Sequence, residues 1–164
     1  MKTLIVFGSK YGTTEKCAKM IRENLDGKAD LVNLKKQTTV EVNSYDTILI
    51  GGSIYAGKLQ QEVKKFVDGY HKTLENKNVG LFLCCQEKGE KARAFMNNNL
   101  PRWIVEKAFV KEILGHEIYL EKMNFFERFL MKAVFKIKKN YSKLDLTAIQ
   151  RIGEKIKAKD AVNE

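Results

Sequence analysis

The sequence predicts an α/β fold built from repeated strand–helix units over a parallel sheet. Short apolar runs rich in β-formers alternate along the chain with stretches whose apolar residues recur at helical spacing. The first run, residues 3–7, is apolar almost throughout, as is typical of a central strand buried on both faces. The length of 164 residues suits one domain, so we expect residues 1–164 to form a single unit.

Each further element follows from a local pattern. Apolar runs predict strands at 3–7, 29–34, 46–50, 79–85 and 109–119, the last of them with a break at Gly115. Apolar residues spaced three and four apart predict helices at 14–25, 59–70, 91–100, 125–139 and 144–157. The polar stretch 35–45 connects the second strand to the third.

Charge and composition narrow the choice of partners. Thirty Lys and Arg residues against twenty Asp and Glu give a net charge of +10, which favours nucleic acid, anionic lipid or a small polyanion. The chain has no recognised nucleic-acid motif, so we expect no nucleic-acid partner. No apolar run approaches ~18 residues and the N-terminus lacks a signal-peptide core, which predicts a cytoplasmic protein. Three cysteines without CxxC spacing predict neither a disulfide framework nor a metal site.

Three loops follow predicted strands at their carboxyl ends, where ligands bind in open parallel sheets. The first loop leads into a helix and consists of Ser9, Lys10, Tyr11, Gly12, Thr13 and Thr14. Hydroxyls, a glycine and free amides at a helix N-terminus form an anion site. The loop matches neither GxxxxGK[ST] nor GxGxxG, so a monophosphate fits better than ATP or a dinucleotide. The alternative is that the threonines only cap the helix and Gly12 only makes a turn.

The second and third loops suit a flat heterocycle. The second leaves its strand through Gly51 and Gly52 and continues with Ser53, Ile54, Tyr55, Ala56 and Gly57. Tyr55 is expected to lie against the ring, while backbone groups bond the ring edge. The alternative is a tight turn with a surface tyrosine. The third loop is expected on the other side of the ring and consists of Cys85, Gln86, Glu87, Lys88 and Gly89.

These residues resemble the flavodoxin-like FMN proteins. The run from Ser9 to Thr14 is similar to the phosphate loop of that family, [ST]-x-T-G-x-T, with Tyr11 in place of the usual threonine. The second and third loops stand at the positions of the two ring-binding loops of the family. The resemblance implies FMN as cofactor. It also implies a doubly wound, five-stranded parallel sheet in the order 2-1-3-4-5 with helices on both faces.

A narrower resemblance covers nearly the whole chain. The runs 53–57, 95–97 and 125–132 are similar to the menaquinone-dependent protoporphyrinogen oxidases, flavodoxin-like FMN enzymes of haem biosynthesis that work beside the membrane. This implies oxidation of protoporphyrinogen IX to protoporphyrin IX, with electrons passed to a quinone. The flavin would carry the chemistry, so no catalytic side chain is expected. The rival function is a flavodoxin-type electron carrier, but such carriers are typically acidic and this chain carries +10.

The predicted helix 125–139 has two faces. Its apolar face is expected to pack on the sheet and holds Phe125, Phe126, Phe129, Leu130, Ala133, Val134 and Ile137. The opposite face carries Arg128, Met131, Lys132, Phe135, Lys136, Lys138 and Lys139. Cations around exposed apolar side chains suit an anionic membrane surface or an apolar, carboxylated ligand. The alternative is a solvated face on which a loop or another subunit covers Met131 and Phe135.

Overall fold

The computed structural model describes residues 1–162 and confirms the α/β fold with a central parallel sheet. Its parallel strands are β1 (Thr3–Phe7), β2 (Ala29–Asn33), β3 (Thr47–Tyr55), β5 (Asn78–Cys84) and β6 (Val110–Ile113). They stand in the order β2-β1-β3-β5-β6, which is the expected order, because β4 (Lys58–Leu59) only adds a short antiparallel ladder to β3.

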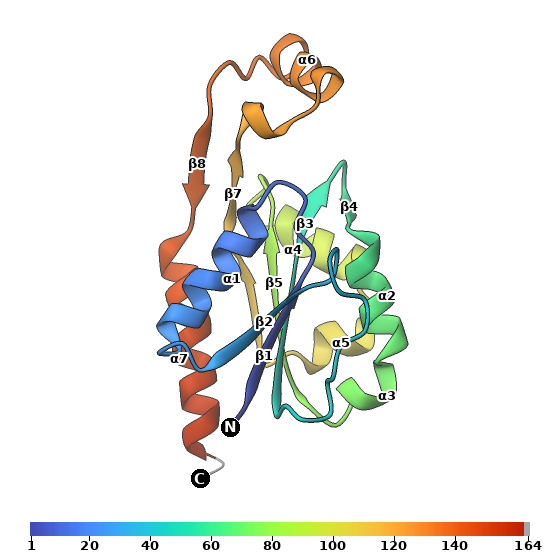
Figure 1. Cartoon of the computed structure of the whole chain (residues 1–164), viewed down its shortest axis with the longest axis vertical. Helices are drawn as coiled ribbons and strands as arrows, with labels where there is room; N and C mark the ends of the chain where they lie inside the picture. Colours follow the sequence, from blue (N-terminus) through green and yellow to red (C-terminus); the bar gives the residue numbers. More distant parts are fainter. Residues whose placement is uncertain (163–164) are drawn as a thin grey trace.

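Helices cover both faces of the sheet (Figure 1). On one side lie α1 (Thr13–Asn24) and α7 (Leu146–Val162). On the other side lie α2 (Gln61–Gly69), α3 (His71–Leu74), α4 (Gly89–Asn99) and α5 (Arg102–Lys107). Side chains of β1 alternate between the two layers, so that Ile5 packs with α1 and α7 while Leu4 packs with α2 and α4. All five residues of β1 are buried, which explains its nearly continuous apolar run.

The predicted break at Gly115 is confirmed. The chain leaves β6 and enters β7 (Gly115–Ile118), which pairs antiparallel with β8 (Tyr141–Leu144) in a separate two-stranded ladder. Gly115 has φ +78°, and a Cβ at this position would lie 2.0 Å from the Lys143 carbonyl oxygen. Only glycine therefore allows β7 to turn away from the sheet and approach β8 so closely. Sequence reasoning did not foresee β8 or α5.

The expectation that helix 125–139 packs on the sheet is wrong. The segment between β7 and β8 holds a 3₁₀ turn, η1 (Leu120–Lys122), and the shorter helix α6 (Phe125–Ala133), none of whose residues is buried. Phe125 is 88% exposed, Phe126 71% and Phe129 60%. The β7–β8 ladder extends beyond the end of the sheet and holds α6 there (Figure 1), so the helix cannot reach the core. Phe135, Lys136, Lys138 and Lys139 follow the helix, and Lys136 adopts a left-handed φ of 55°.

The second expected loop is also shorter than predicted. Gly51 and Gly52 do not leave the strand, because β3 continues to Tyr55. A Cβ on Gly51 would lie 1.9 Å from Cζ of Phe82, which is fully buried in β5. The glycines therefore serve close packing between strands rather than a turn. The predicted helices 91–100 and 144–157 correspond to α4 and α7, with ends shifted by one to five residues.

Candidate functional site

Three loops lie beside the carboxyl ends of β1, β3 and β5. The strand order reverses between β1 and β3, since β2 lies on the other side of β1, and such a reversal opens a crevice in parallel sheets. The hydroxyls of Thr14 and Ser53 lie 2.5 Å apart and tie the first loop to the second. The rings of Tyr11 and Tyr55 make an edge contact with centroids 5.7 Å apart. The structure thus brings together the first two predicted loops.

The first loop is shaped around Gly12. This residue has φ +96° and precedes α1, whose N-terminus has no side-chain cap. Ser9 Oγ accepts from the Gly12 amide at 3.2 Å and so closes the turn. The amides of Thr13 and Thr14 have no intrahelical acceptor, and within residues 1–162 the Thr13 hydroxyl has no hydrogen-bond partner. Free amides, a free hydroxyl and a helix N-terminus fit a phosphate group.

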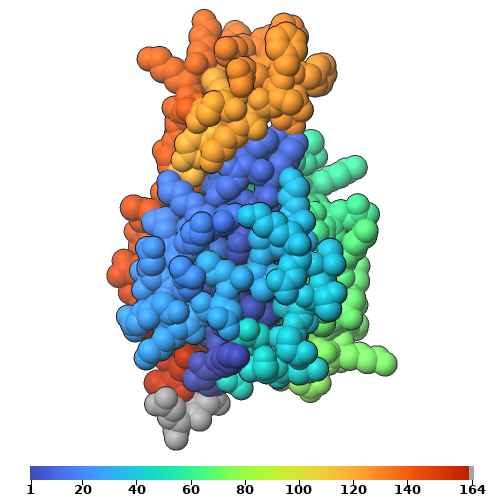
Figure 2. Space-filling view, in the orientation of Figure 1, coloured from blue at the N-terminus to red at the C-terminus, as the bar shows by residue number. Residues whose placement is uncertain are grey.

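Lys122 and Glu127, which lie far from the first loop along the chain, form bonds with it. Lys122 Nζ donates to the Tyr11 carbonyl at 3.1 Å and lies 3.3 Å from where a Cβ on Gly12 would stand. Glu127 of α6 pairs with Lys10 at 2.5 Å. The Lys10 hydrogen bond is the main cause that lowers the pKa of Glu127 to about 2, and the same bond raises the pKa of Lys10. In Figure 2 the orange segment, which contains Lys122 and Glu127, lies directly on the blue N-terminal part.

Sequence reasoning missed Lys122 and Glu127 as neighbours of this loop. More than 100 residues separate them from it along the chain, and the contact depends on how β7 directs the following segment. The one available signal is that Glu127 is the only acid among the seven basic residues from Lys122 to Lys143.

The second loop is a hairpin that presents Tyr55. Ile54 pairs with Leu59 and Tyr55 with Lys58, which leaves Ala56 and Gly57 as a two-residue turn with left-handed φ values of 48° and 76°. Tyr55 is 38% exposed, and burial raises its pKa to about 12, so the phenol stays neutral. The tyrosine therefore offers an uncharged ring beside the crevice.

A buried asparagine, which sequence reasoning missed, holds this hairpin in place. Asn99 of α4 accepts from the Leu59 amide at 2.9 Å and donates to the Gly57 carbonyl at 3.0 Å. Its side chain thereby satisfies backbone groups of the turn that the short ladder leaves unpaired. We regard Asn99 as a positioning residue for Tyr55.

The third loop runs from β5 into α4. Gln86 and Lys88 are exposed, whereas Cys85 is buried and its thiol donates to the Glu87 carbonyl at 3.4 Å. Burial raises the pKa of Cys85. Gly89 is the first residue of α4 and has φ +58°. Cys84, which precedes the loop, points into the core with its sulfur 3.8 Å from that of Cys17. The hydrogen bond with Cys17 and burial raise the pKa of Cys84 well above its usual range, so it serves packing.

The predicted basic face is only partly a face of α6. Arg128 turns inward, since its guanidinium donates to the carbonyls of Leu120 and Met123 at 3.0 and 3.4 Å, and it braces the helix. Met131 is half-buried. The exposed residues of the segment include apolar side chains as well as lysines, and we call the whole set the aromatic–basic surface. It consists of Phe125, Phe126, Phe129, Lys132, Val134, Phe135, Lys136, Lys138 and Lys139. In residues 1–162 no helix is both long and apolar enough to cross a bilayer.

Comparison with known proteins identifies the family. A model of the flavodoxin domain matches residues 4–145. An uncharacterized protein of Methanocaldococcus jannaschii is 39% identical over half of this chain and 53% of its own length. A flavodoxin of Maridesulfovibrio salexigens is 36% identical over 51% of this chain and 62% of its own length. The chain therefore spans only between half and two thirds of these two relatives.

A third relative aligns over more of the chain. The protoporphyrinogen IX dehydrogenase [quinone] of Escherichia coli is 26% identical over 84% of this chain and 80% of its own length. Among solved structures, the two-electron reduced flavodoxin of Megasphaera elsdenii has a TM-score of 0.52 at 23% identity and covers 68% of this chain and 84% of its own. This likeness supports the fold alone. The match of the domain model to most of the sequence shows that the chain belongs to the flavodoxin family of FMN-binding proteins.

Proposed function

We propose that this protein is an FMN-dependent oxidoreductase that oxidises a carboxylated porphyrinogen and passes the electrons to a quinone beside an anionic membrane. The observation that carries the proposal is the aromatic–basic surface, which the Lys10–Glu127 pair links to the first loop. The Escherichia coli relative, whose name gives this reaction, supports it through an alignment over 84% of this chain.

In this proposal the three loops hold FMN. The amides of Thr13 and Thr14, the Thr13 hydroxyl and Lys122 bind the phosphate, because together they supply donors and positive charge around Gly12. Tyr55 lies against the ring, and the run from Cys85 to Gly89 borders the ring's other side. Bound FMN supplies the hydride-accepting chemistry, so the side chains need only bind, orient and exclude water.

The aromatic–basic surface is suited to the lipid interface. Exposed phenylalanines enter the boundary between headgroups and acyl chains, while lysines next to an anionic bilayer contribute about 1 kcal/mol each. Phe125, Phe126 and Phe129 are exposed with no covering element in residues 1–162. A lipid-soluble quinone is reached at such a surface, and a soluble electron carrier has no need of it.

The enzymatic half is tested by turnover. FMN-loaded protein is mixed under anaerobic conditions with protoporphyrinogen IX and a water-soluble menaquinone analogue, and porphyrin fluorescence is followed. We expect fluorescence to appear only when both protein and quinone are present. Absence of turnover with every quinone tested would overturn the oxidase and leave the electron carrier.

The membrane half is tested by vesicle flotation with a matched control. The triple variant Lys132→Gln/Lys136→Gln/Lys138→Gln is expected to lose binding to phosphatidylglycerol vesicles by about 3 kcal/mol at moderate ionic strength. The control Lys64→Gln/Lys65→Gln/Lys72→Gln removes the same charge from α2 and α3 and should bind as wild type. Equal binding of the two variants would contradict a localised contact.

The second candidate is a flavodoxin-type electron carrier. The similarity to the flavodoxin of Maridesulfovibrio salexigens, at 36% identity over 51% of this chain, favours it. The net charge of +10 counts against it, because carriers of this type are typically acidic. A protein that exchanges electrons with a redox partner, ignores vesicles and does not oxidise the porphyrinogen would support this candidate.

A further inference from the structure

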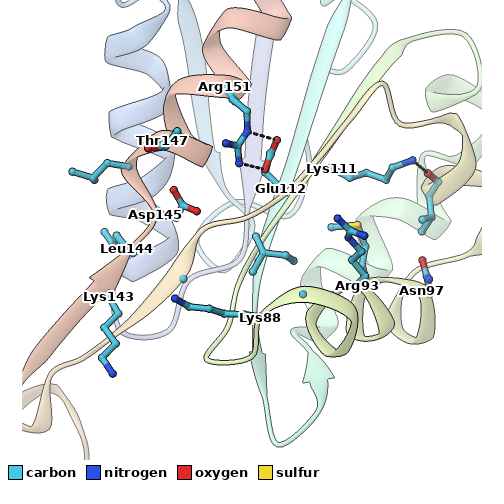
Figure 3. Close-up of a pocket in the computed structure, with 16 residues that line it drawn as sticks. Lys88, Arg93, Asn97, Lys111, Glu112, Lys143, Leu144, Asp145, Thr147 and Arg151 are labelled. Atoms are coloured by element: carbon cyan, nitrogen blue, oxygen red, sulfur yellow. Dashed lines mark hydrogen bonds and ion pairs between the residues drawn. The ribbon is translucent and has the colours of Figure 1, made fainter.

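A large groove lies beside the edge strand of the sheet, separate from the crevice between β1 and β3. It has a volume of about 990 Å³, at the upper end of the range of small-molecule sites. The groove follows β6, with α4 on one side and the start of α7 on the other (Figure 3). Lys88 and Gly89, which belong to the third loop, also line it. A molecule in this groove would therefore lie next to the loop that borders the flavin ring in our proposal.

The charged lining is strongly cationic. Two carboxylates face five cationic side chains: Lys88, Arg93, Lys111, Lys143 and Arg151. Both carboxylates are already engaged. Glu112 forms a two-point pair with Arg151 at 3.0 and 2.9 Å, and Asp145 accepts from the Ala148 amide at 2.9 Å at the start of α7. The remaining cations thus create a positive field that no acid in the groove balances.

Of these cations, Lys88 and Arg93 are available to a ligand. Lys111 donates to the Val105 carbonyl at 3.0 Å, and Lys143 lies over the Tyr141 ring. Lys88 and Arg93, in contrast, form no hydrogen bond or ion pair with any residue from 1 to 162. Figure 3 shows both side chains extending from α4 and its preceding loop into the groove. Burial lowers the pKa of neighbouring His116, and Lys143 and Lys88 lower it further, which is consistent with the local positive field.

The groove also offers apolar surface. Met96, Val105, Ile113, Leu144 and Leu146 line it, and Leu146 is 59% exposed. An exposed leucine on the rim of a cationic groove suits a ligand with an apolar body rather than a small hydrated anion. A free guanidinium pairs well with carboxylate oxygens because its donors match their spacing.

We propose that this groove binds an apolar small molecule that carries carboxylates, with Arg93 and Lys88 pairing with the carboxylates and Leu146 contacting the apolar body. The alternative is that the cations only keep the exposed strand β6 from pairing with other chains. The two readings differ in whether a single charge reversal at Arg93 changes ligand affinity.

The probe is mesoporphyrin IX, an apolar macrocycle with two carboxylates, and its binding to the FMN-loaded protein is followed by porphyrin fluorescence in the dark. Arg93→Glu should weaken binding at least about tenfold, which corresponds to ~1.4 kcal/mol. Lys65→Glu, an equal charge change on α2 away from the groove, should stay within about twofold of wild type. Leu146→Gln should weaken binding several-fold and gives a second measure that leaves the charges intact.

The dimethyl ester of the porphyrin separates charge recognition from nonspecific apolar adsorption. We expect the ester to bind more weakly than the diacid and to be insensitive to Arg93→Glu. Equal affinity of wild type and Arg93→Glu for the diacid, equal affinity for diacid and ester, or no binding of the diacid would each overturn the proposal. Because binding is scored without turnover, failure of the oxidase assay leaves this result unaffected.

Discussion

The sheet and the segment between β7 and β8 differ in how they place phenylalanine side chains, which are buried in the sheet and exposed in the segment. Phe82 of β5 is fully buried against Gly51, where even a methyl group has no room. Phe125 and Phe126 of α6 are exposed, although they belong to a helix with an apolar face. An amphipathic pattern therefore states which face is apolar, but distance from the sheet decides whether the fold covers that face. Packed apolar side chains stabilise the fold, whereas apolar side chains that the fold leaves uncovered are available for binding.

The largest effect is expected where the sheet is tightest. Gly51→Ala places a Cβ 1.9 Å from Phe82 Cζ, so either strand β3 or the ring must move. We expect a loss of about 3 kcal/mol in the free energy of unfolding, measured by urea denaturation. Gly69→Ala is the matched control, because a Cβ there meets nothing within 4 Å. Similar stabilities for the two variants would show that the strands separate more easily than the packing indicates.

A buried ion pair that fixes the ladder to α1 comes next. Lys16 Nζ lies 2.7 Å from Oε1 of Glu117, whose side chain is fully buried in β7. Burial, the largest single influence, would raise the pKa of Glu117, but the hydrogen bonds from Lys16, Ser142 and Tyr119 together outweigh it, so the pKa is lowered. Glu117→Gln should cost about 1–2 kcal/mol at pH 7, less than a fully buried pair, since Lys16 is half exposed.

The pH dependence of that variant follows from the sign of the shift. A carboxyl group with a lowered pKa binds its proton more readily in the unfolded chain, so its contribution is complete above the ordinary pKa of about 4.5. The contribution is lost as the pH falls through the lower value of the folded protein. Glu117→Gln should therefore show a shallower loss of stability below pH ~4.5 than wild type. The control Glu23→Gln, on the exposed side of α1, should retain the wild-type slope.

The phosphate loop is tested by Gly12→Val. A β-branched residue at φ +96° is strained, and its Cβ would approach Lys122 Nζ to 3.3 Å. We expect FMN affinity of the apoprotein to fall at least about tenfold, or ~1.4 kcal/mol, in a fluorescence titration. Gly27→Val imposes comparable backbone strain at φ +75° in a turn with open space around it. That control should lower stability without changing FMN affinity, and an unchanged affinity in Gly12→Val would place the phosphate elsewhere.

The smallest effect on stability is expected on α6. Phe126→Ser removes an aromatic ring that is 71% exposed, so the free energy of unfolding should change by less than about 0.5 kcal/mol. The same substitution at Phe66, which is 4% exposed in α2, should cost about 3 kcal/mol or more. Vesicle binding should show the opposite pattern: Phe126→Ser should weaken it, whereas Phe66→Ser should leave it unchanged. A large stability loss at Phe126 would show that another element or copy covers α6.

Much of the site was accessible to sequence reasoning because its signals are local. Gly12 at a helix N-terminus, the end of β5 at Cys84 and the break at Gly115 each depend on a few adjacent residues. The end of β3 at Tyr55 was predicted too early, because the close packing of Gly51 against Phe82 is a contact between strands. Lys122, Glu127 and Asn99 were not accessible, since their roles depend on contacts across 40 to more than 100 residues of chain. Assignment of the three loops to FMN itself stays a prediction.

The sequence by itself determined the chain order of the five parallel strands and of α1, α2, α4 and α7, because backbone conformation and apolar periodicity are set by near neighbours. Only the tertiary structure decided the rest. It ended α6 at Ala133, left the phenylalanines uncovered, turned Arg128 inward and opened the cationic groove beside β6. The exposure of α6 follows from the β7–β8 ladder, whose direction is fixed by the contact of Gly115 with Lys143 and by the Lys16–Glu117 pair. Local periodicity contains no information about such long-range placement.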